Sequence, residues 1–129
     1  MKELIFYRCG ICGNLMCAVY SSGVTPRCCG QEMECVRPNT VDVGAEKHMP
    51  VIRTADNAVH ISVGSMPHPM TEEHFIEWII LQTNRGTYAR RLMPDRSPKV
   101  CFRIQADEYP LRAYAWCNLH GLWMQNISE

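Results

Sequence analysis

The sequence predicts an all-β protein in two parts, a small metal-stabilised module followed by a β-sandwich. Beyond about residue 40, short segments alternate apolar and polar residues and are separated by turn residues, and no long 3.6-residue periodicity is present. Six of the eight cysteines lie between Cys9 and Cys35, a stretch without histidine, whereas all five histidines lie from His48 onward. This partition predicts two metal sites of different chemistry, one of thiolates alone and one mostly of imidazoles.

The predicted module comprises residues 1–36 and the predicted sandwich domain comprises residues 37–129. A stretch as short as the first cannot build an adequate apolar core, and a bound metal commonly compensates for that lack. Pro38-Asn39 marks a turn in the connector between the two parts.

The strands of the second part are predicted from period-two alternation. Residues 59–63 form one candidate strand, because Val59, Ile61 and Val63 alternate with polar residues. Residues 76–83 and 87–92 flank Asn84-Arg85-Gly86 and predict a hairpin with a glycine-containing turn. Two further alternating segments cover residues 100–104 and 111–117. Several short strands separated by turns favour a sandwich.

The first candidate metal site consists of two cysteine pairs. Cys9-Gly-Ile-Cys12-Gly13 is a knuckle whose tight turn lets two thiolates face one ion, and Cys28-Cys29 supplies a second pair. Four thiolates in a tetrahedron suit zinc or a single iron ion, and a structural zinc is the simpler interpretation of these residues alone. Adjacent cysteines are unusual, because ordinary zinc ribbons use a second Cys-x-x-Cys. The remaining Cys17 and Cys35 are expected to be small buried hydrophobes.

The second candidate site is spread over three segments. They are Glu46-Lys47-His48-Met49-Pro50, His68-Pro69-Met70-Thr71-Glu72-Glu73-His74 and Cys117-Asn118-Leu119-His120-Gly121. Prolines on both sides of His68 restrict its backbone, which suits a fixed ligand. His60 alternates with apolar neighbours on a predicted strand and is expected to face away from the core, so it is left out of the site. Cys101 has no assigned role.

Composition and charge narrow the class of protein. The formal net charge is zero, which gives no indication of binding to nucleic acid or to an anionic membrane. The N-terminus is apolar for only four residues, and no stretch approaches the length of a transmembrane segment, so a cytoplasmic protein is expected. In that compartment clustered cysteines favour metal binding over disulfides.

Three interpretations of the two sites remain open from the residues alone. The first is a redox-inert structural protein with two zinc ions. The second is a copper electron-transfer protein, although blue copper uses two histidines and one cysteine, and four candidate histidines fit that set poorly. The third is an iron redox protein.

The N-terminal motif resembles desulforedoxin, a small rubredoxin-like iron protein. The resemblance is carried by Tyr-Arg-Cys-x-x-Cys-Gly-Asn and Cys-Cys-Gly-x-x-Met, with matching residues Tyr7, Cys9, Cys12, Gly13, Cys28, Cys29, Gly30 and Met33. It implies a mononuclear Fe(Cys)4 electron-transfer centre rather than a structural zinc.

The histidine segments resemble superoxide reductase of the desulfoferrodoxin type. The shared pattern runs Glu-Lys-His-x-Pro, then His-Pro-Met-Thr-x-x-His-x-Ile-x-Trp, then Cys-Asn-x-His-Gly-Leu-Trp. With the N-terminal module, the resemblance covers nearly the whole chain and implies an immunoglobulin-like sandwich that forms a homodimer. It also implies a second mononuclear iron, Fe(His)4(Cys), held by His48, His68, His74, His120 and Cys117.

The activity that this resemblance implies is the one-electron reduction of superoxide to hydrogen peroxide. Electrons would come from a donor protein such as rubredoxin, and the Fe(Cys)4 centre could pass them on. Lys47 would attract superoxide and Glu46 would ligate the resting ferric iron. Without the resemblance, both residues are an ordinary solvated loop.

Overall fold

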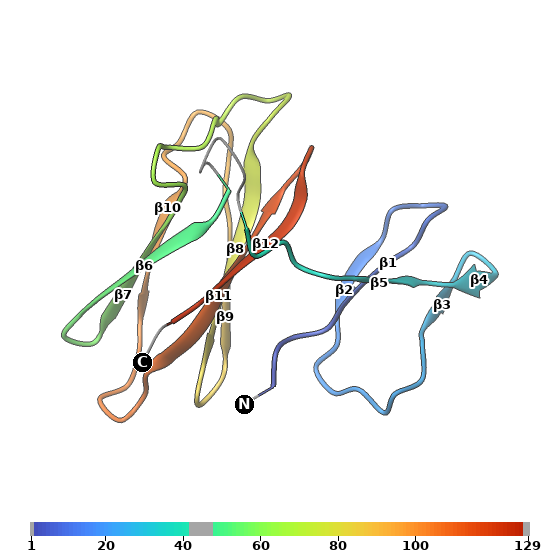
Figure 1. The fold of residues 1–129 in the computed structure, drawn as a ribbon, viewed down its shortest axis with the longest axis horizontal. Helices are drawn as coiled ribbons and strands as arrows, with labels where there is room; N and C mark the ends of the chain where they lie inside the picture. The colour runs from blue at the N-terminus through green and yellow to red at the C-terminus, as the bar shows by residue number, and fades with distance from the viewer. Residues whose placement is uncertain (1, 42–47, 128–129) are drawn as a thin grey trace. The chain divides into compact units, whose positions relative to one another are not determined.

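The structure is a computed structural model that describes residues 2–41 and 48–127, and its chain divides into two compact units. Unit 1 is Met1–Arg37 and unit 2 is Pro38–Glu129. Every regular element in the described ranges is a β-strand, which confirms the predicted all-β class (Figure 1). No helix in those ranges is long and apolar enough to cross a membrane.

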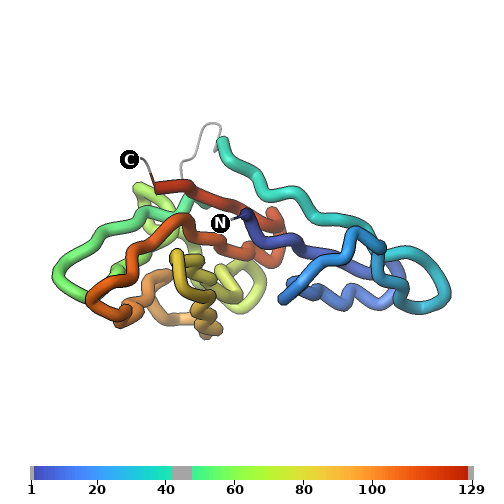
Figure 2. Tube along the Cα trace, turned by 90° about the horizontal axis from the view of Figure 1, so that it is seen from below, coloured from blue at the N-terminus to red at the C-terminus, as the bar shows by residue number. Residues whose placement is uncertain are grey.

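Unit 1 is built from two small antiparallel sheets. Its three-stranded sheet has the order β2-β1-β5, formed by β1 (Phe6–Arg8), β2 (Leu15–Cys17) and β5 (Glu34–Val36). β3 (Arg27–Cys28) and β4 (Gln31–Glu32) form a separate two-stranded hairpin. The strands β1 and β5 come from the two ends of the unit and lie side by side (Figure 2).

The buried core of unit 1 is small. It contains Tyr7, Cys9 and Met33, with a few partly buried side chains packed against them. So little apolar burial supports the view that a bound ion stabilises this unit.

Unit 2 is a sandwich of two antiparallel sheets. The first sheet has the order β10-β7-β6, with β6 (Pro50–Ala55), β7 (Ala58–Val63) and β10 (Lys99–Arg103). The second has the order β12-β11-β8-β9, with β8 (Ile76–Thr83), β9 (Thr87–Arg91), β11 (Pro110–Cys117) and β12 (Gly121–Asn126). All five strands predicted from alternation are present, and β6 and β12 are two strands that were not predicted.

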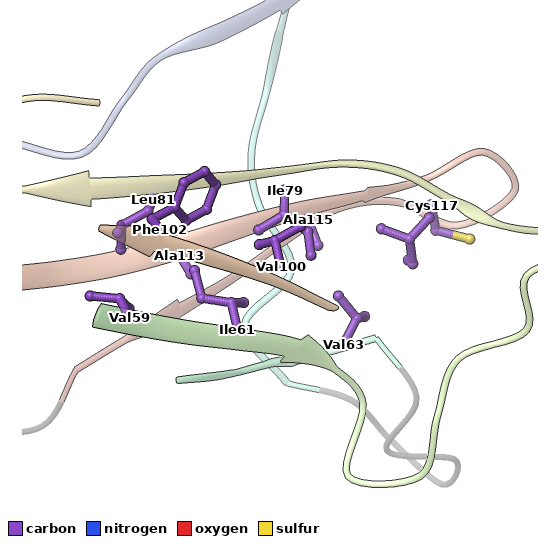
Figure 3. Packing of buried hydrophobic residues seen from close by; sticks show 11 residues of the cluster. Val59, Ile61, Val63, Ile79, Leu81, Val100, Phe102, Ala113, Ala115 and Cys117 are labelled. Carbon is purple, nitrogen blue, oxygen red and sulfur yellow. The ribbon is translucent and has the colours of Figure 1, made fainter. Parts of the chain in front are cut away.

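The core of unit 2 lies between the two sheets. Alternate residues of each strand point inward, and Figure 3 shows the resulting cluster, to which β7 contributes Val59, Ile61 and Val63 and the facing sheet contributes Ile79 and Leu81. Val63 and Cys117 lie at one end of this cluster (Figure 3). Strand ends and connecting segments therefore meet at that end of the sandwich, beyond the packed side chains.

Candidate metal centres

The first cluster of possible ligands lies in unit 1 and contains four cysteines. The sulfur atoms of Cys9, Cys12, Cys28 and Cys29 all lie within 4.8 Å of one another. Cys12 Sγ is 3.7 Å from Cys28 Sγ, and Cys28 Sγ is 3.9 Å from Cys29 Sγ. The structure thus brings together all four residues predicted for the thiolate site.

The backbone around this cluster explains how both pairs can converge. The amides of Ile11 and Cys12 donate to Cys9 Sγ at 3.4 Å each, so the knuckle turns around that sulfur. In an extended strand, successive side chains point to opposite faces, which would separate Cys28 from Cys29. Cys29 instead has φ +54°, in the left-handed region, and Gly30 follows with φ +78°. This local turn lets adjacent cysteines share one site.

The electrostatics of the four thiols indicate a cation site. Amide donation, chiefly from Cys12, lowers the pKa of Cys9 to about 6. Hydrogen bonds with Cys12 and Cys9 raise the pKa of Cys29 to about 12. One thiolate therefore disfavours ionisation of its neighbours, and all four can ionise together only when a cation compensates them. This donor set fits iron or zinc.

The second cluster lies in unit 2 and is a closed ring of four imidazoles. Neighbouring ring centroids are 4.9 Å apart for His48–His68, 4.7 Å for His68–His74, 5.1 Å for His74–His120 and 4.8 Å for His120–His48. All four pairs meet edge-to-face, with interplanar angles between 64° and 81°. Four rings at nearly equal spacing around a common centre are the arrangement expected of four imidazole ligands to one ion.

Cys117 joins this ring from the buried end of β11. Its sulfur lies 3.7 Å from His120 Nδ1, and its ligand atom and those of His48, His74 and His120 all lie within 4.8 Å of one another. His68 is not in this closest group and adjoins it through its ring contacts with His48 and His74. Burial raises the pKa of the Cys117 thiol, although the amides of Leu119 and His120 partly oppose the shift. A buried thiol that is costly to ionise alone becomes a thiolate when it binds a cation.

Hydrogen bonds indicate which nitrogen of each candidate histidine could bind an ion. His68 Nδ1 donates to the carbonyl oxygen of Pro69 at 2.7 Å, which leaves the lone pair on Nε2. Among the described residues, that Nε2 is buried with no hydrogen-bond partner, as expected of an atom that serves to coordinate a metal ion. His48 Nε2 and His120 Nδ1 approach to 3.0 Å. His120 therefore presents Nδ1, whereas His48 and His68 present Nε2.

His68 is also held in the neutral form that a ligand requires. It is 3% exposed, and this burial is the main reason why its pKa falls to about 4. The neighbouring histidines lower the pKa further. A neutral imidazole keeps its Nε2 lone pair available across the physiological pH range.

Asn118 ties together two of the ligand segments. Its Oδ1 accepts from the Phe75 amide and its Nδ2 donates to the Glu73 carbonyl, both at 2.9 Å, so its side chain bonds to the residues on either side of His74. Because Asn118 directly follows Cys117, it couples the position of His74 to that of the thiol. The sequence pattern alone did not predict this role of Asn118. Its position could have suggested such a role, because Asn118 is a polar residue at the end of a strand, between the candidate ligands Cys117 and His120.

Trp123 is a second residue without an earlier assignment. Its indole stacks on His48 at 4.5 Å with an interplanar angle of 13°, and its Nε1 donates to the His120 carbonyl at 3.2 Å. Trp123 thereby orients one ligand ring and the backbone of another.

Other residues singled out from the sequence have simpler positions. Glu46 and Lys47 lie outside the described residues. His60 and Cys101 are exposed, as expected for His60. The expectation that Cys17 and Cys35 are buried was wrong, because both are exposed. They lie on β2 and β5, the two outer strands of a three-stranded sheet in a unit too small to bury both of them.

Comparisons with known proteins agree on one family. A family model described as Desulfoferrodoxin matches residues 40–126. A desulfoferrodoxin from Syntrophotalea carbinolica is 40% identical over 122 residues, covering 95% of each chain. A desulfoferrodoxin homologue from Archaeoglobus fulgidus is 42% identical over 117 residues, covering 91% of this chain and 92% of that protein. The crystal structure of the superoxide reductase from Treponema pallidum superposes with a TM-score of 0.83 at 35% identity, covering 96% of this chain and 98% of the other.

Proposed function

The chain belongs to the desulfoferrodoxin family, and on that premise we propose that it is a superoxide reductase, an oxidoreductase that converts superoxide to hydrogen peroxide. The observation that carries this proposal is the ring of four imidazoles closed by the buried thiol of Cys117. Two of these side chains, those of His68 and Cys117, are almost fully buried at the end of the sandwich.

The donor set decides between the three metal interpretations. Four imidazole nitrogens and one thiol exceed both the four-ligand set of a structural zinc and the two-histidine set of blue copper. They fit iron, which is the metal of the desulfoferrodoxin family. We therefore assign iron to His48, His68, His74, His120 and Cys117, and a second mononuclear iron to Cys9, Cys12, Cys28 and Cys29.

When bound in unit 2, ferrous iron would supply the single electron that superoxide takes up together with two protons from solvent. The protein side chains prepare this chemistry. The Pro69 carbonyl fixes the tautomer of His68, and Trp123 fixes the plane of His48. Cys117, as a thiolate, would donate electron density to a bound iron and so favour its loss of an electron. The Asn118 side chain fixes the position of His74 relative to Cys117.

The proposed role of unit 1 is electron transfer through its four thiolates. We also propose that the enzyme acts in the cytoplasm, forms a homodimer, and takes electrons from a reduced donor protein such as rubredoxin. None of the eight cysteines, all of which lie among the described residues, forms a disulfide, which suits a reducing compartment.

Metal analysis with a visible spectrum of the oxidised protein tests the assignment. We expect about two iron atoms per chain and two separate thiolate-to-iron absorption envelopes, followed by peroxide formation when the reduced protein meets superoxide. Colourless zinc protein, or copper in the metal count, would contradict the proposal.

We further propose that Lys47 attracts superoxide and that Glu46 ligates the ferric iron at rest. The support is their position directly before His48 in the sequence. Because a fixed cation raises the local concentration of an anion, Lys47→Ala should slow the second-order reaction with superoxide roughly tenfold. Salt screens such attraction, so the wild-type rate should fall more steeply than the variant rate as ionic strength rises. Pulse radiolysis across a salt series measures both. Equal rates and equal slopes would return Lys47 to the role of a solvated loop residue.

A further inference from the structure

The outward-facing strand residues of the sheet β10-β7-β6 include three cations and no acid. Three rows of paired residues cross the three strands, and the residues between them point into the core. The outward positions are Val51, Arg53, Ala55, Ala58, His60, Ser62, Lys99, Cys101 and Arg103. Three are permanent cations and none is an acid, although the chain as a whole has no net charge.

The cations of this face are exposed and available. Arg53, Lys99 and Arg103 are all exposed, and within the described part of the chain none of them forms an ion pair. A depression on the face is lined by Arg53, His60, Ser62, Lys99 and Cys101. The face is therefore concave and cationic.

One edge of the face lies close in sequence to His48, a member of the cluster of four histidines. The row Val51–Ser62–Lys99 is the edge row, and Val51 is three residues after His48. The Gly64 amide, just after β7, donates to the carbonyl of Met49, the residue that follows His48, at 2.9 Å. A protein seated on this row would lie close to the segment that carries His48, one of the candidate metal ligands.

We propose that this face is the docking surface for an acidic electron-donor protein. The inference rests on the proposed function, because each superoxide consumed removes one electron that must be replaced from outside the protein. Charge complementarity selects an acidic partner and raises its association rate. A second copy of this chain is disfavoured as the occupant, because a two-fold contact through this face would oppose like charges.

The test compares two sets of charge-neutralised holoproteins. The triple variant Arg53→Gln/Lys99→Gln/Arg103→Gln removes the cations of the face. Arg85→Gln is the matched control, because Arg85 is an exposed arginine already paired with Asp107. Each oxidised protein is mixed with a reduced rubredoxin of net negative charge, and separately with hexaammineruthenium(II), a small cationic reductant. Each reduced protein is also mixed with superoxide.

We expect the triple variant to be reduced by rubredoxin at least about tenfold more slowly at low ionic strength, with a weaker salt dependence than wild type. Its reduction by hexaammineruthenium(II) and its reaction with superoxide should match those of the Arg85→Gln control. Equal rubredoxin rates for all proteins would overturn the inference. An equal slowing with superoxide would also overturn it and assign the face to substrate attraction. A wild-type protein that does not react with superoxide would refute the proposed function instead.

Discussion

At the scale of single residues, we expect the thiol of Cys117 to affect the reaction with superoxide more than any other side chain. Cys117→Ser replaces a polarisable thiolate with a much weaker electron donor, so we expect iron to remain associated with the four imidazoles while superoxide turnover is lost. The thiolate absorption band of unit 2 should disappear as well. Stopped-flow rates and the visible spectrum measure both effects.

Cys101→Ser is the matched control for this substitution, because Cys101 is exposed and belongs to neither ligand cluster. It should leave rate and spectrum unchanged. Normal turnover by Cys117→Ser with iron bound would remove the assigned role of Cys117.

A second residue-scale prediction concerns the buried carboxylate of Glu108, which is 7% exposed. Burial opposes its ionisation, but donation from the Thr83 hydroxyl, the Gln105 amide and the Tyr88 hydroxyl outweighs burial and lowers its pKa. Because the folded-state pKa is lower than the unfolded-state value of about 4.3, the unfolded chain binds more protons in acid. Glu108 therefore stabilises the fold above that pH, and this contribution is lost as the pH falls below it.

Glu108→Gln should accordingly show a smaller loss of thermal stability than wild type between about pH 5 and pH 3. Thermal unfolding followed by circular dichroism across this range measures the difference. Asp107→Asn is the control, because Asp107 forms an exposed pair with Arg85 and such pairs contribute little to stability. Parallel pH profiles for wild type and Glu108→Gln would show that the carboxylate charge does not stabilise the fold.

At the scale of elements, the site depends on loops that are held together across the end of the sandwich. Asn118→Ala removes both hydrogen bonds that hold the segment around His74, so the ligand ring loses its spacing. Residues that orient metal ligands typically change metal affinity by about 10- to 100-fold when they are removed, and we expect a loss of iron affinity in that range. Competition with a chelator measures it.

Asn84→Ala is the matched control. Asn84 Oδ1 accepts from the Tyr109 amide at 2.8 Å, which is the same kind of loop bridge made away from the ligand cluster. It should lower stability by about 0.5–1.5 kcal/mol without changing iron affinity. If both variants released iron equally readily, Asn118 would have only a general structural role.

The two strands missed from the sequence show why element prediction failed where it did. β6 begins with consecutive Pro50, Val51 and Ile52, and β12 contains consecutive Leu122, Trp123 and Met124, so neither alternates. Leu122, Trp123 and Met124 are all buried. When neighbouring residues are buried together, the period-two pattern that signals a half-exposed strand is absent.

At the scale of the whole molecule, the two ligand clusters lie in different units and share no residue. Cys29→Ser should therefore remove the unit 1 iron while the pre-reduced variant still reacts with superoxide in a single turnover. Cys35→Ser, which changes an exposed cysteine outside the cluster, should leave both irons in place. Iron counting and single-turnover kinetics test this, and a variant that kept its unit 2 iron but lost the reaction would contradict the independence of the two sites.

The donor chemistry of the two clusters and the class of fold could be predicted from the amino-acid sequence alone. The candidate ligands follow from residue types and their spacing, and strands follow from the local alternation of apolar and polar residues. Both can therefore be inferred without coordinates. Only the tertiary structure decided that His120 presents Nδ1 while His68 presents Nε2, that a left-handed Cys29 lets adjacent cysteines converge, and that Arg53, Lys99 and Arg103 share one face. These features depend on how distant strands and loops are placed against each other, and this placement is set by packing across the sandwich rather than by neighbours along the chain.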